Sequence, residues 1–263
     1  MGANKGSKMK QNSKGLKGVA LLFMLLAVLA SCSEGQEKEV ITISAAASLK
    51  TSLQEINQNY MQDYPNQAVT FNFGSTGALR KQIEQGAPID VFLSASSHDY
   101  EELKNSAIVH NGKVLFTNEL VMVTKGSKVR TIQEVLQSEE SIAIGNPAIV
   151  PAGEYAKQAL TSFGAWNTLQ GRFVYGKDVT HVLTLLEQGV AQVAIVYASE
   201  IVDDEYRVIH EFGEGDHQEI EYYSSVVKTS DNEEGALLFQ QYLLTEKSLN
   251  VFQKYGFTID IHQ

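Results

Sequence analysis

The sequence predicts an α/β fold with mainly parallel sheets, divided into two lobes. Short apolar runs alternate along the chain with segments in which apolar residues recur at helical spacing, the pattern of strands joined by helices. Hydrophobic residues make up 43% of the 263 and charged residues 20%, as in a folded globular chain. Without a 31-residue targeting segment, 232 residues remain of the 263, which suits two lobes of about 100 residues each.

The first half of this chain contains three strand patterns, each followed by a helical pattern. Strands are predicted over 41–46, 69–73 and 90–95. Apolar residues spaced three or four apart predict helices over 49–60, from 79 to 83, and over 100–104. This succession of strand and helix is typical of parallel sheets, whose strands need long crossover connections.

The second half repeats this alternation. Strands are predicted over 120–123, 142–144, 173–175 and 193–197. One helix has its apolar face between 155 and 163, and another runs from 179 to 186 and ends before Gly189.

Four junctions between a strand and the next helix carry small or hydroxyl-bearing residues, and they span 44–49, 73–79, 150–155 and 177–180. A helix N-terminus presents free backbone N–H groups and the positive end of the helix dipole, which together attract anions. Each junction alone is explained by ordinary helix capping. Four of them, with Tyr197 at the end of a buried strand, favour an anion site at the edge of the sheets where ligands bind.

The chain resembles the molybdate-binding proteins of ABC importers over nearly all of the region after residue 40. The matching blocks are Ile41–Leu49, Gln82–Asp90, Gly145–Pro147, Val150–Gly153, Gly164–Trp166, Ile195–Tyr197 and Tyr255–Thr258. The resemblance implies a two-lobed periplasmic-binding-protein fold of type II, with the ligand in the cleft between the lobes. It also implies that residues 39–119 and 201–263 form the first lobe and residues 120–200 form the second.

The resemblance further implies a set of neutral donors that hold molybdate, and tungstate nearly as well. These are the hydroxyls of Ser48, Thr76 and Tyr197 and the backbone amides of Ala152 and Val179, with Ser75 as the alternative to Thr76. None of them would ligate the metal directly. Molybdate is then cargo handed to a membrane permease, no cofactor is expected, and the protein is expected to be a monomer and not an enzyme.

Residues 1–31 have the pattern of a bacterial lipoprotein signal. Five lysines and no acidic residue precede an apolar run of twelve residues, Val19 to Ala30, which is too short to span a bilayer. The run ends in Leu-Ala-Ser-Cys, which resembles a lipobox, so Cys32 is the expected acylation site. Residues 32–38 are then expected to form a polar tether between the lipid anchor and the folded part of the chain, which would lie on the outer side of the membrane.

Other functions are disfavoured by charge and composition. The formal net charge of −10 leaves no basic face for nucleic acid. Another tetrahedral oxyanion such as sulfate or phosphate stays open as the ligand. Hydrolysis of an oxyanion ester is a weaker alternative, because no pairing of nucleophile and base is evident in the sequence.

Overall fold

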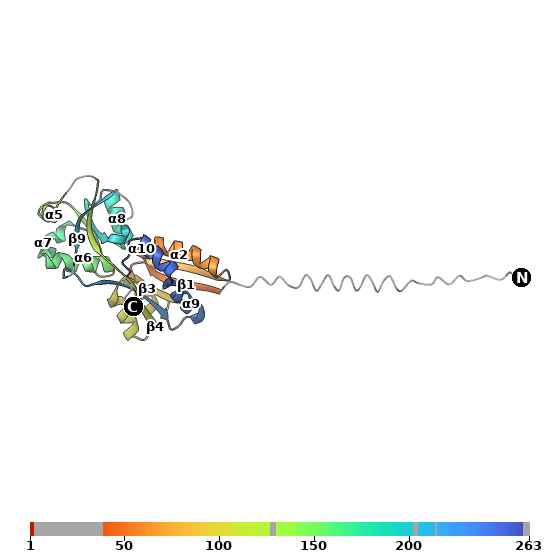
Figure 1. Ribbon diagram of the computed structural model, residues 1–263. Coiled ribbons are helices and arrows are strands. Elements are labelled where there is room, and N and C mark those ends of the chain that lie inside the picture. The colour runs from red at the N-terminus through yellow and green to blue at the C-terminus, as the bar shows by residue number, and fades with distance from the viewer. Residues whose placement is uncertain (3–38, 127–129, 202–204, 214, 260–263) are drawn as a thin grey trace. The chain divides into compact units, whose positions relative to one another are not determined.

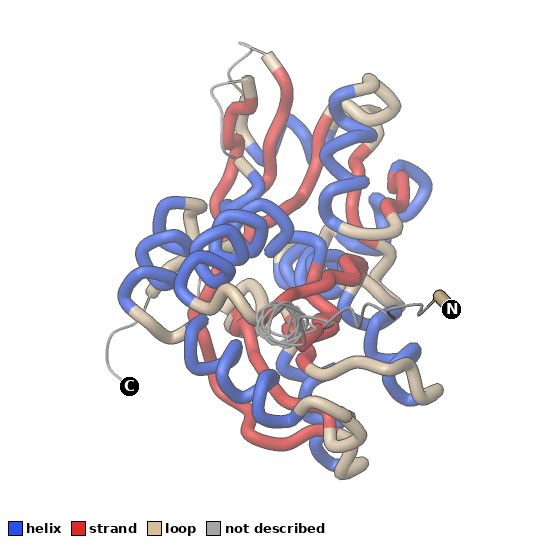
Figure 2. The backbone as a smooth tube through the Cα atoms, turned by 90° about the vertical axis from the view of Figure 1, so that its right-hand side faces the viewer, coloured by secondary structure: helices blue, strands red, loops and turns tan. Residues whose placement is uncertain are grey.

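The computed structural model describes residues 1–2, 39–126, 130–201, 205–213 and 215–259. Among these residues, the strands form two five-stranded sheets, and helices pack beside each sheet (Figures 1 and 2). The α/β architecture predicted from the sequence is therefore confirmed.

The first sheet has the order β2-β1-β3-β10-β4. Its strands are β1 (Glu39–Ala46), β2 (Gln67–Gly74), β3 (Val91–Ser94), β4 (Val109–Asn118) and β10 (Ile220–Val227). β1 lies parallel to β2 and to β3, while β10 runs antiparallel to both β3 and β4. All four residues of β3 are buried, as expected for a central strand covered on both faces.

Helices accompany this sheet because each places one apolar face against it. They are η1 (Ala47–Leu49), α2 (Lys50–Asp63), α3 (Thr76–Glu84), α4 (Ser97–Asn105), α9 (Glu233–Leu243) and α10 (Glu246–Lys254). In α2 the buried face consists of Leu53, Ile56 and Tyr60, at the predicted spacing. The predicted helix over 49–60 thus exists and extends to Asp63.

The second sheet has the order β7-β6-β8-β5-β9. Its strands are β5 (Leu120–Lys125), β6 (Ile142–Gly145), β7 (Phe173–Gly176), β8 (Val193–Tyr197) and β9 (Tyr206–Phe212). The accompanying helices are α5 (Ile132–Gln137), α6 (Pro151–Ser162), α7 (Trp166–Leu169), η2 (Gln170–Arg172), α8 (Val179–Glu187) and η3 (Ala198–Glu200). In Figure 1, α5 to α8 are grouped with β9, whereas α2, α9 and α10 are grouped with β1, β3 and β4.

Each sheet is mixed, which differs in part from the expectation of mainly parallel sheets. The predicted βα alternation does produce the parallel pairs β1–β2, β1–β3, β6–β7 and β6–β8. The antiparallel pairs come from β10 in the first sheet and from β5 in the second. These strands begin where the chain passes from one sheet to the other, so they do not follow a crossover helix within their own sheet.

The strand β9 also differs from the expected assignment of residues 201–263 to the first lobe. It pairs with β5 along its length, from Leu120↔Phe212 to Lys125↔Tyr206, so it extends the second sheet. The chain therefore passes between the sheets at Asn118–Leu120 and again between Phe212 and Ile220. The other expected lobe boundaries stay a prediction.

The segment that precedes β1 carries the expected signal peptide, the tether and Cys32. Residues 3–38 lie outside the described residues, so these expectations remain predictions. Within the described part of the chain, no helix is both long and apolar enough to cross a bilayer.

Two glycines let α6 approach the end of β6 closely. A Cβ atom on Gly153, in the first turn of α6, would lie 2.1 Å from the carbonyl oxygen of Gly145. A Cβ on Gly145 would in turn lie 2.5 Å from a methyl carbon of Val150. Only glycine at both positions allows the helix N-terminus to sit at this distance from the sheet.

We expect Gly153→Ala to destabilise the fold by about 1–3 kcal/mol, because the added methyl forces α6 away from β6. Thermal unfolding followed by circular dichroism measures this change. Gly171→Ala is the matched control, because a Cβ at Gly171 meets nothing within 4 Å. Equal melting temperatures for the two variants would contradict the close approach.

Candidate functional site

All of the predicted ligand residues line one small cavity at the carboxyl ends of strands from both sheets. The first sheet contributes Ser48, Ser75 and Thr76, and the second contributes Ala152, Val179 and Tyr197. The cavity encloses about 220 Å³ of empty space, its opening included. The four junctions singled out in the sequence therefore meet in space.

Side-chain caps are missing from three of the four helices that begin at the cavity. Away from the cavity, the N-termini of α4, α5, α9 and α10 are each capped by a side chain, whereas the short helix α7 is not. At the cavity, η1, α3 and α6 have no side-chain cap. Side-chain capping thus does not explain three of the four junctions. At α3, however, the N–H groups of Gly77, Ala78 and Leu79 already bond to backbone carbonyl oxygens.

Ser48 lies in η1, directly after β1, and its side chain is partly exposed to the cavity. Its Oγ is 2.9 Å from the hydroxyl oxygen of Tyr222. This hydrogen bond fixes the serine side chain at the cavity wall.

Ser75 and Thr76 occupy the N-cap and first positions of α3, and both are buried. The Thr76 Oγ1 accepts a hydrogen bond of 3.2 Å from the backbone N–H of Ala95, which leaves the threonine hydrogen free to donate. Ser75 lines the cavity as well and makes no capping bond. The geometry supports either hydroxyl as the donor from this junction.

The amide of Ala152 is prepared by the start of α6. Pro151 occupies the first helical position, where it lacks an N–H and presets the backbone. The N–H groups of Gly153 and Glu154 both bond to the carbonyl oxygen of Val150. For the N–H of Ala152, the described residues offer no acceptor, so it can donate into the cavity.

The amide of Val179 is the first of α8. Asp178 is the N-cap of this helix, and its Oδ1 accepts a 2.7 Å hydrogen bond from the N–H of His181. This junction is the one of the four at which the capping explanation also holds. Val179 itself is buried and lines the cavity.

Tyr197 ends β8 with only 2% of its surface exposed. Its hydroxyl is buried, and no described residue accepts or donates a hydrogen bond to it. Burial raises the pKa of this phenol well above its usual value, so the hydroxyl keeps its proton. A buried hydroxyl without a partner costs about 1–3 kcal/mol, which a ligand in the cavity would recover.

The cavity has the electrostatics of a neutral-donor site. Its wall contains no Lys, Arg or His among the described residues, and the one ionisable acid, Asp178, already caps α8. The other lining residues are small or apolar: Ala46, Ala47, Gly74, Ala95, Val150 and Pro151. In the described part of the chain, moreover, no group of three or more His, Cys, Asp or Glu could hold a metal cation.

Comparison with known proteins places the chain in a family. A profile of the bacterial extracellular solute-binding proteins matches residues 41–258. The chain belongs to this family of solute-binding proteins.

Individual relatives match this solute-binding protein over most of its length. It is 36% identical to a candidate ABC transporter substrate-binding lipoprotein, YvgL of Bacillus subtilis, with 88% of this chain and 90% of YvgL covered. It is 35% identical to the molybdate-binding protein ModA of Escherichia coli, with 92% and 96% covered. The solved substrate-binding domain of a candidate molybdenum ABC transporter from Clostridium difficile is 34% identical and has a TM-score of 0.67, with 85% of this chain and all of that chain covered.

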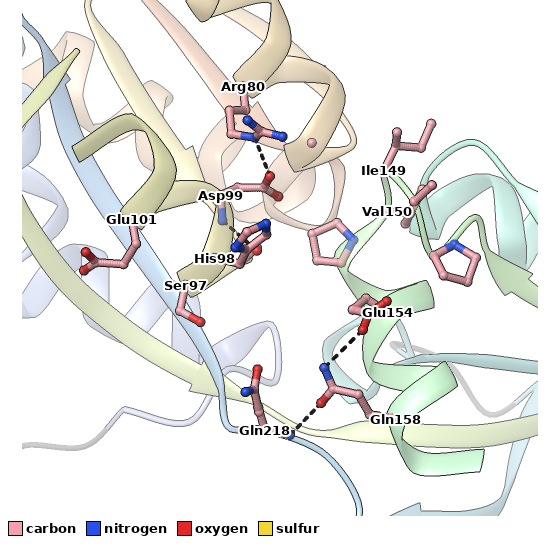
Figure 3. Close-up of a pocket in the computed structure, with 15 residues that line it drawn as sticks. Arg80, Ser97, His98, Asp99, Glu101, Ile149, Val150, Glu154, Gln158 and Gln218 are labelled. Carbon is pink, nitrogen blue, oxygen red and sulfur yellow. Dashed lines mark hydrogen bonds and ion pairs between the residues drawn. The ribbon is translucent and has the colours of Figure 1, made fainter. Parts of the chain in front are cut away.

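The solute-binding protein also has a wider cleft beside the small cavity. Figure 3 shows Arg80, His98 and Asp99 on one side of it and Ile149 and Glu154 on the other. The cleft encloses about 1230 Å³ of empty space, open solvent included. Its one arginine is paired with Asp99 at 2.8 Å and also with a glutamate, so its charge is already neutralised. An anion is better placed in the small cavity.

The backbones on the two sides of this cleft meet at one point. The N–H of Gly77 donates a 3.2 Å hydrogen bond to the carbonyl oxygen of Ile149. A Cβ on Gly77 would lie 2.8 Å from that same oxygen. Glycine at this position therefore lets α3 and the start of α6 come close enough to share one ligand.

Glu200 lies near the site and can titrate close to neutral pH. No motif in the sequence singles out this residue. It lies in η3, three residues after Tyr197. Burial, together with the negative charge of Asp178, raises the pKa of its carboxyl to about 7. No local sequence pattern indicates this shift, because Asp178 lies 22 residues before Glu200 in the sequence.

We expect the raised pKa of Glu200 to make the stability depend on pH. The folded state retains a proton that the unfolded state releases near pH 4.5, so the contribution of this carboxyl to stability is fully present below about pH 4.5 and is lost as the pH rises through about 7. Glu200→Gln should raise the melting temperature by several degrees at pH 8 relative to wild type and by much less at pH 5. Glu102→Gln, at an exposed position, is the control. A pH-independent difference would contradict the assignment.

Proposed function

We propose that this protein binds molybdate, and tungstate nearly as well, and delivers it to the permease of an ABC importer. The observation that carries the proposal is the buried, unpartnered hydroxyl of Tyr197 in a cavity lined by hydroxyl side chains and by the first residues of helices. The names of the relatives from Escherichia coli and Clostridium difficile support molybdenum oxyanions as the ligand class.

The donor set favours a dianion for a physical reason. Hydrogen bonds to a charged acceptor are about twice as strong as those between neutral groups, and they strengthen further where water is excluded. Helix N-termini add the positive ends of their dipoles at η1, α3, α6 and α8. Such a site requires no counter-ion from the protein, and the oxygens of the anion, rather than the metal, would accept the hydrogen bonds.

Selection between anions of equal charge then depends on size. Fixed donors suit one length of bond between the central atom and oxygen, so molybdate and tungstate should bind alike and the smaller sulfate should bind weakly. The ligand would be cargo, and the site would need neither a cofactor nor a catalytic residue. We propose that the protein acts as a monomeric binding protein and not as an enzyme.

Calorimetric titration of the purified domain with molybdate, tungstate, sulfate and phosphate tests the proposed function. Molybdate and tungstate should bind tightly and compete for one site, and sulfate and phosphate should bind far more weakly. Sulfate or phosphate binding as tight as molybdate would contradict the assignment of the ligand. Turnover of phosphate or sulfate esters would contradict the assignment as a binding protein.

We expect Tyr197→Phe to weaken molybdate binding by about tenfold to a hundredfold, because one donor to a desolvated dianion is lost. The apo fold should not be destabilised, since the hydroxyl has no partner among the described residues. Thr76→Val and Ser75→Ala, measured in the same way, decide which hydroxyl of that junction contacts the anion. Unchanged affinity in Tyr197→Phe would remove this residue from the site.

We also propose that Cys32 anchors the protein to the outer side of the membrane through an acyl group. The sequence pattern before Cys32 supports this, as does the lipoprotein name of the Bacillus subtilis relative. Cys32→Ala should release the protein into the soluble fraction or leave it uncleaved, without changing the affinity of the purified mature domain. Normal cleavage and acylation of the variant, followed by mass spectrometry, would contradict the anchor.

A further inference from the structure

Tyr222 is a buried residue behind the proposed anion site. It lies in β10, and its surface exposure is 0%. Its hydroxyl oxygen is 2.9 Å from the Oγ of Ser48 and 3.3 Å from the Nδ2 of Asn118. Ser48 lines the cavity, whereas Tyr222 is not among the lining residues, so the Tyr222 hydroxyl can influence a ligand only through Ser48.

The surroundings of Asn118 determine which way its amide faces. Its Oδ1 accepts hydrogen bonds from the backbone N–H of Glu119 at 2.9 Å and of Ser199 at 3.4 Å. Rotating the amide by 180° would place its NH₂ group against these two donors. The Nδ2 must therefore face the other way, where it donates to the Oγ of Ser199 at 2.8 Å and to the hydroxyl oxygen of Tyr222.

The direction of the next hydrogen bond follows from this orientation. Because Tyr222 accepts from Asn118, its own hydrogen needs an acceptor, and the Oγ of Ser48 is the acceptor within reach among the described residues. Burial raises the pKa of the Tyr222 phenol, so its hydrogen is retained. The Ser48 oxygen is then occupied as an acceptor, and the serine hydrogen is free for the cavity.

Packing holds the Tyr222 ring in place independently of its hydroxyl. Its ring centroid lies 5.0 Å from that of Phe116 and 5.3 Å from that of Phe257. The ring also makes an edge contact with Tyr197, with centroids 6.0 Å apart. One side chain of the first sheet therefore supports two proposed donors, Ser48 by a hydrogen bond and Tyr197 by packing.

We propose that Asn118 and Tyr222 are positioning residues that direct the Ser48 hydroxyl hydrogen into the cavity, as a donor to the bound oxyanion. The inference rests on the proposed function, because it assigns the donor state of one residue of that site. The relay runs from the Asn118 amide to the Tyr222 hydroxyl, then to the Ser48 hydroxyl and to the anion. Asn118 is the last residue of β4, and the chain enters the second sheet directly after it. The orientation of the Ser48 hydroxyl therefore depends on the segment that joins the two sheets.

A double-mutant cycle on the purified domain tests the relay, with molybdate affinity measured by calorimetry. Tyr222→Phe keeps the packed ring and should weaken binding about three- to tenfold, because the Ser48 hydroxyl loses its orientation. Ser48→Ala should weaken binding at least as much. The double variant should bind no more weakly than Ser48→Ala, since the Tyr222 hydroxyl acts only through Ser48 and Tyr222→Phe keeps the ring that packs on Tyr197.

Tyr60→Phe is the matched control. Tyr60 is also fully buried, and its hydroxyl has no partner among the described residues, but it lies in α2 away from the cavity. The affinity of the Tyr60→Phe variant for molybdate should equal that of the wild-type protein. A Tyr222→Phe affinity equal to wild type would overturn the relay, and so would an undiminished effect of Tyr222→Phe in the Ser48→Ala background. If wild type binds none of molybdate, tungstate, sulfate and phosphate, the proposed function fails and the relay fails with it.

Discussion

The cavity depends on donors that the fold leaves without partners among the described residues, namely the Ala152 N–H and the Tyr197 hydroxyl. Where strands of the two sheets end, η1, α3 and α6 begin without a side-chain cap, although α8 at the same cavity has one. Uncapped helix N-termini are unfavourable when they are buried, unless something accepts their hydrogen bonds. A small anion with several oxygens can satisfy donors from four junctions at once, which a protein side chain cannot do.

This convergence requires the two sheets to approach closely, and glycine makes that possible. Gly77 brings α3 against the carbonyl oxygen of Ile149, and Gly153 brings α6 against Gly145. The first contact spans the wide cleft, and the second places the Ala152 amide at the cavity wall. The backbones lie so close together at Gly77 and Gly153 that a side chain would not fit there, and this closeness brings the donors within reach of one ligand.

The α/β fold and the candidate site could largely be predicted from the sequence because they depend on local patterns. The four junctions between strands and helices are identified by periodicity and by small or hydroxyl side chains, whereas the individual donors from Ser48 to Tyr197 follow from the resemblance to the molybdate-binding proteins. The edge strands β4 and β9 were not predicted, since both are partly exposed and their apolar alternation is weak. The strand β10 was not predicted either, although most of its residues are buried. Tyr222 is also missed, because its partners Ser48 and Asn118 are 174 and 104 residues away in the sequence.

The central claim is that neutral donors hold an oxyanion in the small cavity, and not in the wide cleft that contains Arg80. A crystal structure of the tungstate complex tests it most directly, because anomalous scattering locates the tungsten atom without reference to the protein. The account predicts one tungsten atom whose oxygens lie within hydrogen-bonding distance of Ser48, Tyr197 and the amides of Ala152 and Val179. A tungsten atom located beside Arg80 in the wide cleft, or no ordered tungsten at all, would contradict it.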